Sequence, residues 1–166
     1  MRILETERLA LDEFTLSDAP YILEALTDPS FTENIGDRGL STLEDARAYL
    51  EGGPLAAYRD PGHHMWRVTE KATGEVVGMC GLIKREGLDD VDVGYALLPR
   101  FWGKGYAVEA AAACVDWGLT VKGYPRIVAI IKPGNAASAK VLGKLGMAPQ
   151  GLVELPNGTS ELWAPA

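Results

Sequence analysis

The sequence has no long apolar run and few basic residues. No apolar stretch approaches the roughly 20 residues that a membrane-spanning helix needs, and the stretch Met1 to Glu5 becomes charged too early for a signal-peptide core. The chain has 16 lysines and arginines against 23 acidic residues, a net charge of −7, so it has no electrostatic footprint for nucleic acid. We therefore expect a cytoplasmic protein that binds neither membrane nor nucleic acid. Its acidic surface favours cationic partners such as amines or basic peptides.

Cysteine and histidine are also scarce. Cys80 and Cys114 each fall inside a predicted regular element, so we expect small core residues rather than reactive thiols. His63 and His64 follow a turn predicted at 60–62, where we expect solvated side chains. No cysteine or further histidine stands at ligand spacing from them, and the sequence therefore predicts no metal site.

The composition is otherwise that of an ordinary globular protein. Apolar residues make up 47% of the 166 residues and charged residues 23%, which is close to the usual composition of such domains. A chain of this length can bury a sizeable core as one unit. It has no internal repeat, low-complexity tract or linker, and we expect a single domain over residues 1–166.

The rest of the chain is organised around one stretch, Val91 to Lys122. Apolar residues alternate along its start, which predicts a strand that Pro99 ends because proline cannot donate a ladder hydrogen bond. Gly103 and Gly105 then stand two residues apart, and an alanine-rich segment with helical spacing follows over 106–122. The predicted order is strand, glycine-rich turn and helix.

This order of elements suits the binding of an anion. The first N–H groups of a helix have no partner within the helix, and the dipole makes that end positive. Glycines let a ligand approach the backbone, and Arg100 and Lys104 add positive charge. The expected ligand is a phosphate or pyrophosphate. A Walker A loop would need Ser or Thr at Gly105 and a dinucleotide fingerprint would need glycine at Val108, so both common alternatives fail.

Periodicity and turn residues predict the remaining elements. The expected strands cover 6–14, 65–70, 75–84, 91–98, 127–131, 148–155 and 160–164, and the other expected helices cover 17–28, 42–53 and 135–146. Ser17, Thr42 and Asn135 are the expected N-caps. The polar segment 30–41 is expected to be a long loop. Together these elements predict a mixed α/β (α+β) protein with about seven strands and four helices.

Several motifs carry a resemblance to a known family. Arg100, Gly103 and Gly105 fill the acetyl-CoA signature of the GCN5-related N-acetyltransferases (GNAT), which reads Gln or Arg, two residues, Gly, one residue, and Gly or Ala. The order of the predicted elements resembles the GNAT fold across nearly the whole chain. Further motifs are similar to the family's RimJ/RimL-like branch of ribosomal-protein N-terminal acetyltransferases, and they are Thr6 to Leu9, Asp92 to Tyr95, Asn135 with Ser138, and Lys144 to Met147.

The resemblance implies acetyl-CoA as cosubstrate. In the family, backbone N–H groups of the glycine-rich turn bind the pyrophosphate of CoA. The pantetheine arm lies where the strand before the turn and the strand after the helix splay apart, and it pairs with the first of them like an added strand. The implied cofactor-binding residues are Ala96, Leu97, Leu98, Arg100, Phe101, Trp102, Gly103, Lys104, Gly105, Tyr106, Asn135 and Ser138.

The resemblance also implies direct transfer without a covalent enzyme intermediate. A neutral amine attacks the thioester carbonyl, a backbone N–H stabilises the oxyanion, and a general acid protonates the leaving thiolate. Many GNAT enzymes use a tyrosine of the last helix as this acid, but the chain has Leu142 there. Ser138 is then the implied acid, and its alternative is a buried serine bonded to the preceding turn. Asp92 stands where the branch often has glutamate, so the alternatives are a general base and a solvated or structurally paired carboxylate.

The expected function is that of an acetyl-CoA-dependent N-acetyltransferase. The acceptor stays open between a protein N-terminal amine and a small-molecule amine such as a polyamine or an amino acid, and another acyl-CoA is an alternative donor. A non-catalytic CoA-binding sensor or regulatory module is the alternative function, because the usual tyrosine is missing. We expect a monomer or a homodimer.

Overall fold

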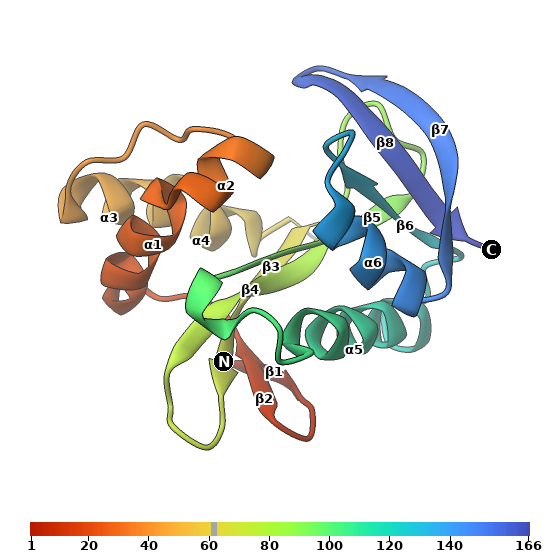
Figure 1. Ribbon diagram of the computed structural model, residues 1–166. Helices are drawn as coiled ribbons and strands as arrows, with labels where there is room; N and C mark the ends of the chain where they lie inside the picture. The colour runs from red at the N-terminus through yellow and green to blue at the C-terminus, as the bar shows by residue number, and fades with distance from the viewer. Residues whose placement is uncertain (61–62) are drawn as a thin grey trace.

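Eight strands of the described residues, 1–60 and 63–166, form one sheet in the order β1-β2-β3-β4-β5-β6-β8-β7 (Figure 1). The structure is a computed structural model. The turn predicted at 60–62 and the side chains of His63 and His64 lie outside what it describes. The strands are β1 (Arg2–Glu5), β2 (Leu9–Asp12), β3 (His63–Glu70), β4 (Val76–Ile83), β5 (Val91–Leu97), β6 (Ile127–Ile131), β7 (Met147–Leu155) and β8 (Gly158–Pro165).

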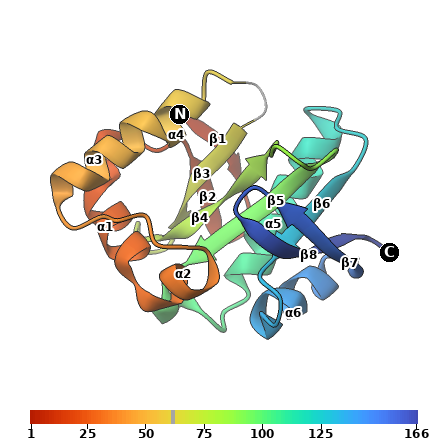
Figure 2. The same cartoon turned by 90° about the horizontal axis from the view of Figure 1, so that it is seen from above.

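The helices are distributed around this sheet in two groups. Figure 2 shows α1 to α4 on one side of the molecule and α6, with β7 and β8, on the other. Helix α5 runs along β4 and β5, where Trp117 meets Trp66 of β3 edge to face at 4.9 Å between ring centroids. The bounds are α1 (Ala19–Thr27), α2 (Pro29–Asn34), α3 (Leu43–Gly52), α4 (Pro54–Ala57), α5 (Tyr106–Thr120) and α6 (Ala136–Lys144).

The mixed fold expected from the sequence is confirmed, with three additions, which are strand β1, helix α2 and the short helix α4. Strand β1 pairs with β2, where Arg2 Nε donates to Asp12 at 2.8 Å, so the described sheet has eight strands rather than about seven. The segment 30–41 was expected to be a loop, but α2 occupies its beginning. Asp28 caps this helix by accepting from the Ser30 N–H at 2.9 Å, and Pro29 occupies its first turn. The pair Asp28-Pro29 therefore both ends one helix and starts another.

The helix caps are partly as expected. Thr42 forms a capping box with Asp45, and the Asn135 side chain accepts from the Ser138 N–H at 3.2 Å, which confirms two of the three expected N-caps. The expectation for Ser17 was wrong, because a short 3-10 turn starts at the N-cap Thr15, whose N–H donates to Asp18 Oδ2 at 2.9 Å. The helical start shifts by two residues and the buried face of α1 is kept.

Both cysteines lie in the core, as predicted. Cys80 of β4 and Cys114 of α5 are fully buried and free, with their sulfur atoms 3.6 Å apart. They pack α5 against the sheet, and nothing reaches them from solvent. Across residues 1–60 and 63–166, no helix is both long and apolar enough to cross a membrane.

Candidate active site

The glycine-rich turn has the backbone that the sequence predicts for an anion site. Gly103 and Gly105 have φ angles of +76° and +81°, in the left-handed region that residues with a Cβ rarely adopt. Gly105 is the N-cap of α5, and no side chain among the described residues caps this helix. The first N–H groups of a helix of 15 residues therefore face outward beside a backbone without Cβ atoms.

Arg8, the residue before β2, contacts this turn although it lies far away in the sequence. Its Nη1 donates to the carbonyl of Lys104 at 2.9 Å, and its Nε donates to Glu109 in the first turn of α5 at 2.8 Å. The backbone N–H of Arg8 also donates to Glu109, at 3.0 Å. Burial would raise the pKa of Glu109, but hydrogen bonds from Thr6 and Arg8 outweigh it and hold that pKa below its usual value. The motif Thr6 to Leu9 is thus physically joined to the glycine-rich turn.

Strand β5 has a free edge next to the turn. Among the described residues, β6 pairs with β5 at Val91 and Asp92 alone, and the two parallel strands then separate. On the other side, β5 pairs with β4 from Asp92 to Leu97, and the Leu98 N–H donates to the Val77 carbonyl at 3.0 Å. The carbonyl of Leu97 points the opposite way and accepts from Trp102 Nε1 at 3.0 Å. Because backbone groups alternate along a strand, Tyr95 also presents its N–H and C=O to the separated edge.

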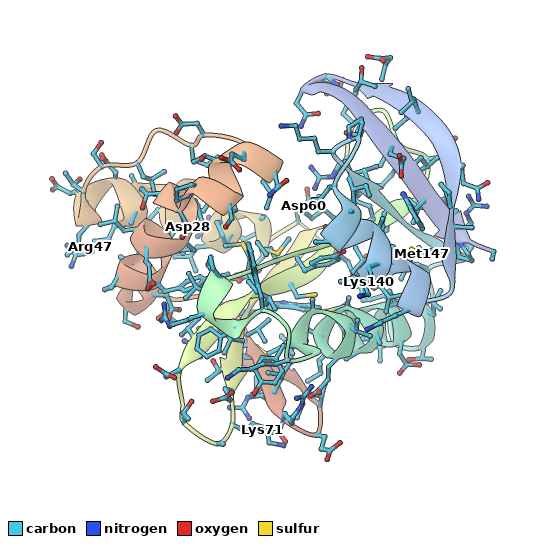
Figure 3. All side chains as sticks on the ribbon, in the orientation of Figure 1. Asp28, Arg47, Asp60, Lys71, Lys140 and Met147 are labelled. Carbon is cyan, nitrogen blue, oxygen red and sulfur yellow. The ribbon has the colours of Figure 1, made fainter. Side chains whose placement is uncertain are left out.

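A cleft of about 1410 Å³ opens from this edge. One wall consists of the ends of β5 and β6, the glycine-rich turn and α6, which carries Lys140. The opposite wall comes from α2 and its neighbours, with Asp28 at the start of α2, and Figure 3 labels residues of both walls. Lys132 Nζ joins the two walls by donating to the carbonyl of Glu33 at 2.7 Å. This volume exceeds the roughly 300–1,000 Å³ of a typical small-molecule pocket, so the cleft has room for a cofactor arm and a second ligand.

Comparison with known proteins identifies the fold. Residues 8–148 match the Acetyltransferase (GNAT) domain family. The chain belongs to this family. The p20 protein of Bacillus licheniformis, described as an uncharacterized N-acetyltransferase, is 31% identical over 155 residues, which cover 92% of this chain and 86% of p20. The chain spans about half the length of another curated relative, from Bacillus subtilis, of which 51% is matched at 41% identity.

Solved structures agree with this assignment. An acetyltransferase of the GNAT family from Bacillus anthracis superposes with a TM-score of 0.78 at 26% identity, over 99% of this chain and 96% of that one. A structure described as RimL, a ribosomal L7/L12 alpha-N-protein acetyltransferase in complex with coenzyme A, gives a TM-score of 0.74 at 18% identity, over 99% and 97%. At that identity the likeness to RimL concerns the fold. The enzyme class predicted from the sequence, acetyltransferase, is confirmed.

Ser138 of this GNAT chain lies on the first turn of α6 and lines the cleft. Its N–H is capped by Asn135, but its Oγ has no hydrogen-bond partner in the described part of the chain. No bond from this hydroxyl to the preceding turn is therefore present there. The hydroxyl of Tyr95, which sequence reasoning did not single out, donates to the carbonyl of Ser138 at 3.3 Å. Burial raises the pKa of Tyr95 although this bond opposes the shift, so the phenol stays protonated at neutral pH.

Asp92 lies at the opposite end of β5 from the turn. Its side chain is 1% exposed, and Arg85 Nε donates to Asp92 Oδ2 at 2.8 Å. Both residues line the cleft. Because a buried carboxylate is costly without a partner, this ion pair fixes the position of both side chains. The structure thus brings Asp92 to the cleft as a paired carboxylate.

Most residues of the predicted cofactor site border the cleft together. The exceptions are Arg100, whose Nη1 donates to Glu24 of α1 at 2.6 Å, and Lys104, whose ammonium lies 5.6 Å from the centre of the Phe101 ring. Phe101 and Tyr106 are buried residues that also border the cleft. The other predicted residues that border it are Ala96, Leu97, Leu98, Trp102, Gly103, Gly105, Asn135 and Ser138. Within residues 1–60 and 63–166, no cluster of His, Cys, Asp and Glu could hold a metal ion.

Proposed function

We propose that this GNAT enzyme transfers an acetyl group from acetyl-CoA to a primary amine, either a protein N-terminus or a small molecule, by direct attack. One observation carries the proposal. The free edge of β5 begins where its pairing with β6 stops after Asp92, and it leads to the uncapped N-terminus of α5 behind a turn with positive φ angles. An extended arm with a pyrophosphate at one end, which is the shape of CoA, fits both features at once.

The residues of the cleft supply what the transfer requires. The amine nitrogen attacks the thioester carbon, and the N–H of Tyr95 or Leu97 on the free edge stabilises the oxyanion. The carbon–sulfur bond breaks, and the leaving thiolate takes a proton from Ser138 Oγ, which regains one from solvent. The proton released by the amine nitrogen leaves through water in the open cleft. The products are the N-acetylated amine and CoA.

Calorimetric titration with acetyl-CoA, CoA and ATP tests the proposal, followed by thiol release with a panel of amines. We expect saturable binding of acetyl-CoA and CoA, no comparable binding of ATP, and amine-dependent thiol release. Absence of binding to both CoA species would make the glycine-rich turn a structural feature alone. Binding without thiol release from any amine would favour the non-catalytic sensor.

A further inference from the structure

Arg85 occupies the end of the cleft that the cofactor leaves open. It follows β4, whose last residue, Ile83, pairs with Asp92 in the β4–β5 register. The glycine-rich turn lies beyond the other end of β5. Five residue steps of strand separate Asp92 from Leu97, which is about 17 Å. A ligand that reaches Arg85 therefore lies beyond the acyl end of the arm, where the acceptor amine must enter.

The guanidinium of Arg85 is fixed on one side and open on the other. Its Nε is held by the buried carboxylate of Asp92 at 2.8 Å, while its side chain is 35% exposed and lines the cleft. Among residues 1–60 and 63–166, no side chain or carbonyl other than that of Asp92 bonds to Arg85. The Nη–H donors thus form a preorganised fork toward the cleft, and such a fork matches the two oxygens of a carboxylate or phosphate.

The surroundings of Arg85 favour a single negative charge over a double one. The carboxylate of Asp92 lies directly against Arg85, and the apolar side chain of Ile83, whose strand pairs it with Asp92, also lines the cleft. Like charges at short range disfavour a phosphate dianion, and the apolar neighbour excludes water that would solvate it. A carboxylate carries one charge and two oxygens, and it fits this position better.

We infer that Arg85 binds a carboxylate of the acceptor, and that the acceptor is a small amine bearing a carboxylate, of the amino-acid class. The inference rests on the proposed acetyl transfer and names its substrate class. The amine of such an acceptor points toward the thioester, and its carboxylate lies on the Arg85 fork. The protein has a net charge of −7, but the carboxylate of the substrate would contact the positive guanidinium of Arg85 directly. The net charge therefore does not exclude an anionic group on the substrate.

Matched acceptor pairs test this inference. Thiol release from acetyl-CoA is measured with amino acids and with their amides, which have the same side chain and amine but no carboxylate. An amide has the less basic amine, so more of it is neutral at a given pH, and a preference for the acid cannot come from amine reactivity. We expect kcat/KM for the acid to exceed that for the amide by about tenfold, mainly through KM.

Two variants assign this preference to Arg85. Asp92→Asn keeps Arg85 and should keep the preference, whatever happens to kcat. The double variant Arg85→Gln/Asp92→Asn differs from it in Arg85 alone, contains no uncompensated buried carboxylate, and should have an acid-to-amide ratio near one. Binding of acetyl-CoA, measured by calorimetry, should be the same in both.

Each outcome separates this inference from the proposed function. If the wild-type protein acetylates amines but does not prefer the acid, or if the double variant keeps the preference, the inference about Arg85 is overturned and acetyl transfer stands. If other amines are acetylated but no amino acid of the panel is, the inference about Arg85 is likewise overturned and acetyl transfer stands. If acetyl-CoA does not bind at all, the proposed function itself fails.

Discussion

The two walls of the cleft are built in opposite ways. The wall proposed for the cofactor comes mostly from one continuous stretch, Val91 to Thr120, in which strand, turn and helix follow one another. The opposite wall is assembled from α2 and the segment around Pro54, which are separated in the chain by the loop after α2 and by helix α3. A site made of local backbone geometry can be recognised in a sequence, whereas a site assembled from distant side chains cannot.

The largest effect is expected from a substitution in the wall proposed for the cofactor, which leaves the opposite wall intact. Replacing Gly103 with Glu places a bulky anion where the pyrophosphate is proposed to approach, and should weaken acetyl-CoA binding by more than about 100-fold, which is about 2.7 kcal/mol. Calorimetric titration of the folded variant measures this change.

Gly74→Glu is the matched control for that variant. Gly74 lies in the β3–β4 turn with φ at +77°, against +76° at Gly103, and no atom lies within 4 Å of a Cβ built at either position. Both substitutions should therefore cost similar backbone strain, about 1–2 kcal/mol, but Gly74→Glu should bind acetyl-CoA normally. Equal affinity of the two variants would mean that the pyrophosphate binds elsewhere.

A smaller effect is expected at Ser138, which lies on α6 and lines the cleft. Ser138→Ala removes the proposed acid and should lower kcat by about 10- to 100-fold, with little change in acetyl-CoA affinity, because the Asn135 cap bonds the backbone N–H and not the hydroxyl. Ser138→Cys keeps a proton donor at this position and should recover part of the rate. A fully active Ser138→Ala enzyme would remove Ser138 from the acid role and leave Tyr95, whose hydroxyl donates to the Ser138 carbonyl, as the next candidate.

The sequence allowed prediction of those parts of the fold whose signals are local. The glycine-rich turn, the Asn135 cap and the buried cysteines each depend on residue type and near spacing, and the structure has all three. The pair Asp28-Pro29 has a local signal with two meanings, since proline both ends helices and begins them, and α2 was missed for that reason.

The parts of the site that could not be predicted depend on contacts between distant residues. The bond of Tyr95 to Ser138 spans 43 positions, and that of Arg8 to Lys104 spans 96. The Arg85–Asp92 pair is closer in sequence, but it forms only because the register of β4 on β5 places Ile83 opposite Asp92. A register is fixed by the packing of whole strands, and residue types alone do not reveal it.

The smallest predicted effect concerns Arg8, the contact through which a distant segment supports the cofactor wall. Arg8→Met keeps an apolar stem but loses the bonds to the Lys104 carbonyl and to Glu109, so the turn should become less ordered and acetyl-CoA affinity should fall by about 3- to 10-fold. The Arg8 side chain is 43% exposed, so the free energy of unfolding should fall by no more than about 1 kcal/mol.

Arg2→Met is the control for Arg8→Met, because Arg2 is also exposed and also paired, with Asp12 and Glu5, but lies on β1 and makes no bond to the turn. It should lower stability by a similar amount and leave acetyl-CoA affinity unchanged.

The pH dependence of the free energy of unfolding also distinguishes Arg8→Met from Arg2→Met. The pKa of Glu109 is held below its usual value, so its stabilising contribution is complete above about pH 4.3 and is lost as the pH falls through the lower folded value. Arg8→Met should reduce this acid-sensitive contribution and Arg2→Met should keep it, whereas equal losses of affinity in both variants would mean that the turn does not depend on its contact with β2.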